Sequence, residues 1–237
     1  MLPEGRYVFT DSKRYSISTT PEILSNQSDW TAVVNLAYDN NLNLERAVKF
    51  FYPFMNEDPI GISIQLYEAR NTARFEHPYI AKVYSIVLRL DENPSLGIIL
   101  QKLQKIPEFM TMNEIIRMTH QICSALDCIH SKGYLHTDPY ERNIMMTDNR
   151  DFKLIDFGTV VKIMQSKSFF NGDLIRFARD LYRITSRSVE RKADLPKKIN
   201  WNEIYTPDKN PNGLGNLNSQ FKNCRDFANA VEQILRE

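Results

Sequence analysis

The stretch GYLHTDPYERNIMMTDNRDFKLIDFGTVV, residues 133–161, decides how the rest of the chain is interpreted. Two apolar runs within it, around Ile144–Met146 and Phe152–Ile155, are typical of short buried strands. Three polar side chains lie at the ends of these runs: Asp138, Asn143 and Asp156. Two rigid strands would hold two carboxylates and an amide in fixed positions, which favours a chemical role over a packing role.

Composition limits the classes of protein to consider. The chain has 237 residues, of which 42% are hydrophobic and 25% are charged, as in ordinary globular proteins. Thirty basic residues against 29 acidic residues give a formal net charge of +1, so no global field favours nucleic acid or an anionic membrane. The first residues lack the apolar core of a secretion signal, and no run of roughly 18 apolar residues occurs. We therefore expect a cytoplasmic protein without membrane insertion and without nucleic acid as a partner.

The chain has three cysteines, Cys123, Cys128 and Cys224. Their number is odd, and none belongs to a C-x-x-C pair. Cys123 and Cys128 lie in a segment predicted to be a buried helix, which favours reduced core thiols over a metal or redox site. Reduced thiols fit a reducing cytoplasm.

The first half of the chain is predicted to be mainly strands. Three pairs of apolar runs flank turn-rich segments, which indicates antiparallel hairpins: 6–9 with 14–18, 30–38 with 45–52, and 80–90 with 96–103. One helix interrupts them, because Ile60, Ile64 and Tyr67 recur at helical spacing before the stop signal at His77 and Pro78.

The second half is predicted to be mainly helices. Residues 112–133 place an apolar stripe on one helix face and end in a capping glycine, Gly133. The stripe consists of Ile115, Thr119, Ile122, Leu126 and Ile129. Two more helices are expected at 172–185 and 224–237, with a Gly-, Asn- and Pro-rich loop at 208–219 between them. A strand-rich half followed by a helix-rich half predicts an α+β fold in two lobes, joined near Lys102–Pro107.

The octet HTDPYERN at His136–Asn143, followed thirteen residues after its asparagine by DFG at Asp156–Gly158, resembles the catalytic and metal-binding loops of protein kinases. Ala47–Lys49 (AVK) is similar to the third-strand lysine motif of that family. Glu68 lies ten residues before Pro78, where kinases carry the helix glutamate that pairs with this lysine. Residues 98–103 (IILQKL) resemble the gatekeeper and hinge, with Leu100 as the gatekeeper. The resemblance implies one bilobal kinase-like domain over 1–237, with lobes 1–103 and 104–237.

The resemblance also implies roles. The protein would transfer the γ-phosphate of ATP, with Mg²⁺, to a Ser or Thr hydroxyl of a protein. Lys49 would contact the phosphates and pair with Glu68, and Asp138 would orient the hydroxyl or accept its proton. Asn143 and Asp156 would ligate Mg²⁺. Further residues would line the nucleotide: Val34, Ala47, Gln101, Leu103 and Met145. In the family His136 is a packing residue, so we interpret it as a core histidine.

Several positions depart from the family. The positions of the glycine-rich loop fall on Gln27, Asp29 and Ala32. Tyr140 replaces the lysine of serine/threonine kinases, while Arg142 stands where tyrosine kinases carry a compensating arginine. Arg142 would either reach the transferring phosphate or brace the loop against a neighbouring acid, Glu141 or Asp148.

Two further departures concern regulation and substrate docking. Thr137 replaces the arginine that grips a phosphorylated loop. Asp173, the expected start of the next helix, lies only seventeen positions after Asp156, and no A-P-E motif occurs between them. Three alternatives stay open: a pseudokinase acting as a regulatory or scaffolding module, a small-molecule kinase of the aminoglycoside or choline type, and an unusual transferase on the same fold.

Overall fold

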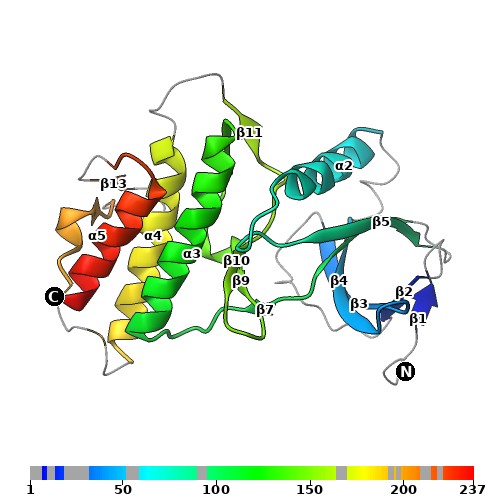
Figure 1. Cartoon of the computed structure of the whole chain (residues 1–237), viewed down its shortest axis with the longest axis horizontal. Helices are drawn as coiled ribbons and strands as arrows, with labels where there is room; N and C mark the ends of the chain where they lie inside the picture. The colour runs from blue at the N-terminus through cyan, green and yellow to red at the C-terminus, as the bar shows by residue number, and fades with distance from the viewer. Residues whose placement is uncertain are drawn as a thin grey trace. The chain divides into compact units, whose positions relative to one another are not determined.

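The computed structural model describes residues 7–9, 14–18, 32–51, 59–89, 95–163, 170–191, 195, 199–208, 215–217 and 221–237. The chain forms two compact units (Figure 1). The first consists of Met1–Glu76 and Ala81–Gln104, and the second consists of His77–Ile80 and Lys105–Glu237. Whether 1–237 is one domain with lobes 1–103 and 104–237 stays a prediction.

The first unit is built on an antiparallel sheet whose six strands follow the order β1-β2-β3-β4-β6-β5. Their bounds are β1 Tyr7–Phe9, β2 Tyr15–Ser18, β3 Ala32–Asp39, β4 Leu44–Phe51, β5 Val83–Arg89 and β6 Ser95–Gln101. All three predicted hairpins are confirmed, because β1 pairs with β2, β3 with β4, and β5 with β6. The sheet is strongly curled (Figure 1).

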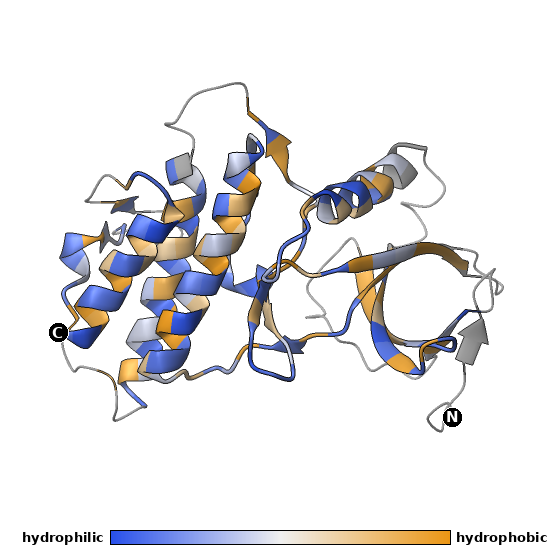
Figure 2. Cartoon of the chain, viewed as in Figure 1, coloured by the Kyte–Doolittle hydropathy of each residue, from blue (hydrophilic) through white to orange (hydrophobic). Residues whose placement is uncertain are grey.

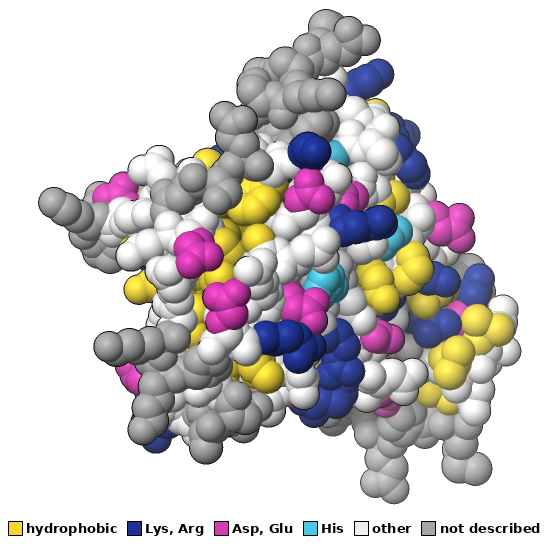
Figure 3. Space-filling view, turned by 60° about the vertical axis from the view of Figure 1, so that its left-hand side comes forward, with side chains coloured by type: hydrophobic (Ala, Val, Ile, Leu, Met, Phe, Trp, Pro, Cys, Tyr) yellow, Lys and Arg dark blue, Asp and Glu magenta, His cyan; other side chains and the backbone are white. Residues whose placement is uncertain are grey.

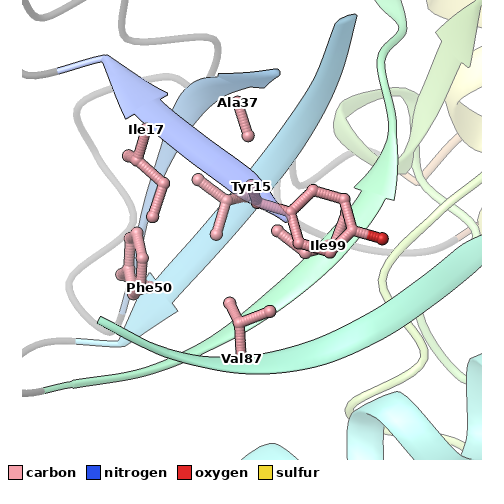
Figure 4. Packing of buried hydrophobic residues seen from close by; sticks show 7 residues of the cluster. Tyr15, Ile17, Ala37, Phe50, Val87 and Ile99 are labelled. Carbon is pink, nitrogen blue, oxygen red and sulfur yellow. The ribbon is translucent and has the colours of Figure 1, made fainter. Parts of the chain in front are cut away.

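One face of the curled sheet forms a hydrophobic core. Figure 4 shows side chains of this cluster converging from β2, β3, β4, β5 and β6. The cluster consists of Tyr15, Ile17, Ala37, Val48, Phe50, Val87 and Ile99. Gly97 pairs with Phe50 across β4 and β6, and a Cβ atom at Gly97 would lie 2.5 Å from the Phe50 ring. Because strand residues alternate between faces, β4 presents Ala47 and Lys49 on the opposite face.

Helix α2 (Pro59–Arg74) confirms the predicted helix, but two of the three apolar residues that indicated it, Ile64 and Tyr67, do not lie on its buried face. Ile64 and Tyr67 are each 44% exposed. Ala69 instead packs with Ala32 and Ile98, with Val83 and Leu100 beside them. Several polar residues of α2 are buried with Ala69: Gln65, Glu68, Asn71 and Thr72. The orientation of α2 therefore places Glu68 in the interior of the unit.

The second unit is mainly helical, as predicted. Its helices are α3 (Met112–Ser131), α4 (Phe170–Val189) and α5 (Cys224–Arg236). All five residues of the predicted α3 stripe are fully buried, and the helices carry apolar and polar faces (Figure 2). A capping box between Thr111 and Glu114 begins α3. Gly133 has a positive φ of 77° and donates its N–H to His130 O, which confirms the predicted C-terminal cap.

Short elements connect these helices. They are β7 (Gln104–Lys105), β8 (Tyr134–Leu135), η1 (Glu141–Asn143), β9 (Ile144–Met146), β10 (Phe152–Leu154), β11 (Val161–Lys162), η3 (Trp201–Glu203), β12 (Tyr205–Thr206) and β13 (Asn216–Leu217). The two predicted short strands are confirmed as β9 and β10, which pair with each other. Residues His77–Ile80 join this unit, because Ile80 bridges to Leu154 and the Leu154 N–H donates to Tyr79 O at 2.9 Å.

The surface, the cysteines and the hydropathy of the helices add three observations. Lys and Arg side chains are interspersed with Asp and Glu on the face seen in Figure 3, as the near-zero net charge leads one to expect. The three cysteines form no disulfide. Among the described residues, no helix combines the length and the hydropathy needed to cross a bilayer.

Candidate active site

In the first unit, an ion pair joins Lys49 on β4 to Glu68 on α2. Lys49 Nζ lies 2.8 Å from Glu68 Oε1 and 2.8 Å from Oε2. The two side chains are 15% and 8% exposed, so water screens the pair weakly. A carboxylate that engages one ammonium through both oxygens fixes where the cation lies. The pair forms because α2 turns Glu68 towards the sheet face that carries Lys49.

Strand register gathers several of the expected nucleotide-lining residues on this face. Val34 lies opposite Lys49, and Ala47 lies opposite the expected gatekeeper Leu100. Directly opposed strand residues point to the same face, so these four share the face that carries the ion pair. The hinge candidates Gln101 and Leu103 end and follow β6. Ala32 begins β3, whereas Gln27 and Asp29 lie outside the described residues.

In the second unit, two side chains hold the carboxylate of Asp138. Arg142 Nη2 donates to Asp138 Oδ1 at 2.6 Å, and Asn143 Nδ2 donates to Oδ2 at 2.6 Å and to the backbone oxygen of Asp138 at 2.9 Å. Arg142 and Asn143 lie four and five residues after Asp138 and belong to the single helical turn η1. This turn folds the chain back, so that both side chains reach the Asp138 carboxylate. The carboxylate is therefore fixed, while each of its oxygens keeps a second lone pair for another donor.

The residues expected to hold a metal also lie in this unit. Asn143 directs its amide nitrogen at Asp138, which leaves the amide oxygen as the atom that can serve a cation. The Ile155 N–H donates to Asn143 O at 2.9 Å, so Asp156 follows immediately after this contact. Asp156 has φ 61° and accepts the Gly158 N–H at 3.3 Å. An amide oxygen and a carboxylate are hard donors of the kind that fits Mg²⁺.

A residue that sequence reasoning treated only as a helix start, Asp173, anchors the catalytic loop. Its carboxylate accepts the N–H groups of His136 at 2.9 Å and Thr137 at 2.8 Å, and contacts His130 Nε2 at 2.8 Å. Burial alone would raise the pKa of Asp173, but the hydrogen bond and charge of His130 and the charge of His136 outweigh burial and lower it. Thr137 needs this support, because it is β-branched and has φ 68°.

His136 behaves as the predicted core histidine. Its side chain is fully buried and contacts Phe157 edge-on, with ring centroids 4.9 Å apart. Nδ1 accepts the Asp138 N–H at 3.3 Å, and Nε2 lies 3.1 Å from Ile155 O. Burial lowers the pKa of His136, although Asp173 and Asp156 act in the opposite direction. The neutral ring thus joins the loop of Asp138 to the strand end before Asp156.

The surroundings of Tyr140 were not expected from the sequence. Its ring contacts two guanidinium groups, with the Arg142 Cζ 4.9 Å and the Arg179 Cζ 4.5 Å from its centroid. Glu141 pairs with Arg187, so the acid that engages Arg142 is Asp138. Arg179 and Arg187 lie on α4, far along the chain from the octet, and no local pattern connects them to it.

The expected site residues thus fall into two groups. The first unit contains Val34, Ala47, Lys49, Glu68, Gln101 and Leu103, and the second contains Asp138, Arg142, Asn143, Met145 (on β9) and Asp156. Each group includes a hydrogen-bonded cluster, Lys49 with Glu68 in one unit and Asp138 with Arg142 and Asn143 in the other. Their shared role in binding ATP stays a prediction.

Comparisons with known proteins identify the family of the chain. The protein kinase domain family matches residues 30–179, which is more than half of the chain. A probable serine/threonine-protein kinase of Clostridium acetobutylicum is 28% identical over 227 residues, covering 82% of this chain and 35% of the relative. PknB of Mycolicibacterium smegmatis is 28% identical over 157 residues, covering 59% and 25%. PknA of Mycobacterium tuberculosis is 29% identical over 136 residues, covering 52% and 31%.

The chain spans about a third or less of the length of these serine/threonine kinases. The match nevertheless includes β4 with Lys49, α2 with Glu68, the loop from Asp138 to Asn143, and Asp156. The chain belongs to the protein kinase domain family and has its bilobal α+β fold.

Proposed function

We propose that this chain is a cytoplasmic protein kinase that transfers the γ-phosphate of ATP to a Ser or Thr hydroxyl of a protein. The proposal rests mainly on two hydrogen bonds to the Asp138 carboxylate. Arg142 donates to one carboxylate oxygen and Asn143 donates to the other. A side chain fixed in this way is suited to orient an incoming hydroxyl and to accept its proton. The serine/threonine specificity rests on the relatives, and the cytoplasmic location rests on three unpaired cysteines.

The other residues have roles that follow from charge and donor type. Lys49, held by Glu68, would contact the phosphates of ATP. Asn143 and Asp156 would hold Mg²⁺, which when bound neutralises phosphate charge. The hydroxyl oxygen bonds to the γ-phosphorus as the bond to the β–γ bridging oxygen breaks. ADP leaves, and the hydroxyl proton passes to Asp138. The face that carries Val34 and Ala47, with Gln101, Leu103 and Met145, would receive the nucleoside.

A second candidate is a regulatory module whose nucleotide site does not turn over. It is favoured by the position of Arg142, which contacts Asp138 and Tyr140 within its own loop. If Arg142 stays there in the presence of ATP, no described residue of the octet supplies the cation that Tyr140 has replaced. The test below separates the two candidates.

The test measures the melting temperature with ATP, with and without Mg²⁺, and in parallel the formation of ADP and phosphoprotein. A ligand that binds only the folded state raises the free energy of unfolding by mass action, and the melting temperature rises with it. The free energy of unfolding rises by about 2.7 kcal/mol at a ligand concentration 100 times Kd. A kinase shows a Mg²⁺-dependent shift together with turnover. A shift without turnover, in the presence of a panel of candidate protein substrates, supports the regulatory module instead.

Two variants assign the roles. Asp156→Asn should remove the Mg²⁺-dependent part of the shift, because a neutral amide replaces a charged ligand of similar shape. Asp138→Asn should keep the shift and lower turnover by roughly 10²–10⁴, because it acts on the transition state and not on bound ATP. Asp148→Asn, in the exposed turn between β9 and β10, is the matched control and should change neither. Equal losses of binding and turnover in Asp138→Asn would make Asp138 structural.

A further inference from the structure

Three potential metal ligands lie close together where α3 packs against α5. They are Asp127 and His130 on α3 and Cys224, the first residue of α5. One carboxylate oxygen, one imidazole nitrogen and the thiol sulfur of this group all lie within 4.8 Å of one another. Cys224 is fully buried and His130 is nearly so. Ligands from two packed helices are a common way to build a metal site in a helical core.

The contacts within the group aim the ligand atoms at one another. Cys224 Sγ lies 3.5 Å from His130 Nδ1. Asp127 Oδ1 accepts the Cys224 N–H at 2.9 Å, which holds the carboxylate at the beginning of α5. Carboxylate, imidazole and thiolate together are a donor set suited to Zn²⁺.

The histidine is oriented as metal-binding histidines are. His130 Nε2 lies 2.8 Å from Asp173 Oδ2, whereas Nδ1 is the ring nitrogen that lies 3.5 Å from Cys224 Sγ. In a zinc-bound His130, Nε2 would donate its proton to Asp173 and Nδ1 would be the ligand atom. A carboxylate behind the distal nitrogen fixes the tautomer and strengthens the ligand in many zinc sites.

A fourth donor lies on the same helix face. Cys123 precedes Asp127 by four residues and His130 by seven, which places all three on one stripe of α3. The Cys123 side chain is buried, although it is not among the three residues whose ligand atoms lie within 4.8 Å of one another. Cys123 and Asp127 also line a cavity of about 240 Å³, together with Arg225 among others, through which an ion could enter.

We propose that Asp127, His130 and Cys224, with Cys123 as the fourth donor, bind a structural Zn²⁺ ion. Binding displaces the two thiol protons, so one Zn²⁺ replaces two H⁺. The inference does not depend on the proposed function. It assigns a metal-binding role to Cys224 and to Cys123, whose helical context in the sequence favoured a reduced core thiol. Asp173 connects the site to the catalytic loop, since the same carboxylate holds His130 and the N–H groups of His136 and Thr137.

The test uses the tag-free full chain, because an affinity tag of histidines would bind metal itself. Native mass spectrometry after growth with added zinc should find roughly one Zn²⁺ per chain. Replacing Zn²⁺ by Co²⁺ should give tetrahedral d–d bands and a sulfur-to-cobalt charge-transfer band from two thiolates. A chelator should lower the melting temperature of the zinc-loaded wild type.

Matched variants locate the ion. Cys224→Ser and Cys123→Ser should each weaken binding by more than about tenfold and reduce the charge-transfer band, whereas Cys128→Ser, on the same helix but outside the group, should change nothing. If Cys224→Ser fails to fold, Asp127→Asn tests the same site while keeping an oxygen for the Cys224 N–H. Absence of metal from the wild type overturns the proposal, as does metal that survives both Cys224→Ser and Asp127→Asn. A band unchanged in Cys123→Ser overturns the four-ligand assignment.

Discussion

At the scale of single residues, the role of Arg142 distinguishes an active kinase from a regulatory module without turnover. Its guanidinium contacts the Asp138 carboxylate and the Tyr140 ring, so it orients the proposed base in this structure. Arg142→Ala should therefore lower turnover by on the order of tenfold or more with little change in melting temperature, because the side chain is 58% exposed. Steady-state kinetics and thermal denaturation measure the two effects.

The control for Arg142 is Arg179, which also contacts the Tyr140 ring and pairs with Asp180. Arg179→Ala removes a guanidinium from Tyr140 without touching Asp138, so it should affect turnover much less. If Tyr140→Lys restores turnover to Arg142→Ala, the arginine supplies charge to the phosphate. Equal loss of turnover in both arginine variants would instead trace the effect to the packing of Tyr140.

His136 provides a prediction for pH. Burial lowers its pKa in the folded state below the ordinary value of 6.5. As the pH falls below about 6.5, the unfolded chain takes up a proton at this histidine that the folded chain does not. The stabilising effect is thus complete above that pH and is lost on acidification towards the folded-state pKa. Melting temperatures between about pH 7.5 and 5.5 should fall more steeply for the wild type than for His136→Gln.

A parallel slope for the wild type and His136→Gln would mean that His136 does not resist protonation in the folded state.

The sequence predicted the residues of the octet and of DFG because their spacing is local and their side-chain types are demanded by the chemistry. It did not predict Asp173 as the anchor of the loop, nor Arg179 and Arg187 around Tyr140 and Glu141. These partners lie on α4, 36 or more residues along the chain from the groups they contact. Only the folded chain brings them to the loop, and nothing in the order of residues marks them.

At the scale of elements, α3 and α2 show when helical periodicity is a sound guide to burial. The α3 stripe was predicted correctly, because α3 is covered by neighbouring helices and its apolar residues decide its orientation. In α2 the apolar residues Ile64 and Tyr67 are exposed, because the helix turns Glu68 towards Lys49. An ion pair inside the unit has overridden the pattern that identified the helix.

The orientation of α2 leads to a prediction about stability. Ile64→Ala should lower the free energy of unfolding by less than about 1 kcal/mol, since the side chain is already 44% exposed. Ile98→Ala, the same change at a β6 residue that is 1% exposed, should cost about 2–5 kcal/mol. Urea denaturation of both variants measures the difference. Similar costs at the two positions would mean that α2 buries its apolar residues in solution.

At the scale of the whole molecule, the two units are not simply the two halves of the chain. Residues His77–Ile80 follow α2 of the first unit in sequence but belong to the second. Lys153 Nζ donates to Pro78 O, Leu154 N donates to Tyr79 O, and Ser124 Oγ contacts His77 Nε2. From the sequence, this segment was predicted only to end the preceding helix. The pair His77-Pro78 indicates where a helix stops, but it does not indicate which residues the following segment contacts.

Ile80 tests this assignment, since it is 1% exposed and bridges to Leu154. Ile80→Ala should lower the stability of the second unit by about 2–5 kcal/mol through lost burial and the cavity left behind. Trp201 is buried in that unit, and in a Trp30→Phe background it is the remaining tryptophan, so its fluorescence reports the unfolding of the second unit. Ile86→Ala, on the exposed side of β5 in the first unit, serves as the control and should cost less than about 1 kcal/mol. A Trp201 transition that Ile80→Ala leaves unchanged would place His77–Ile80 outside the second unit, and the hydrogen bonds from β10 would then contribute little to its stability.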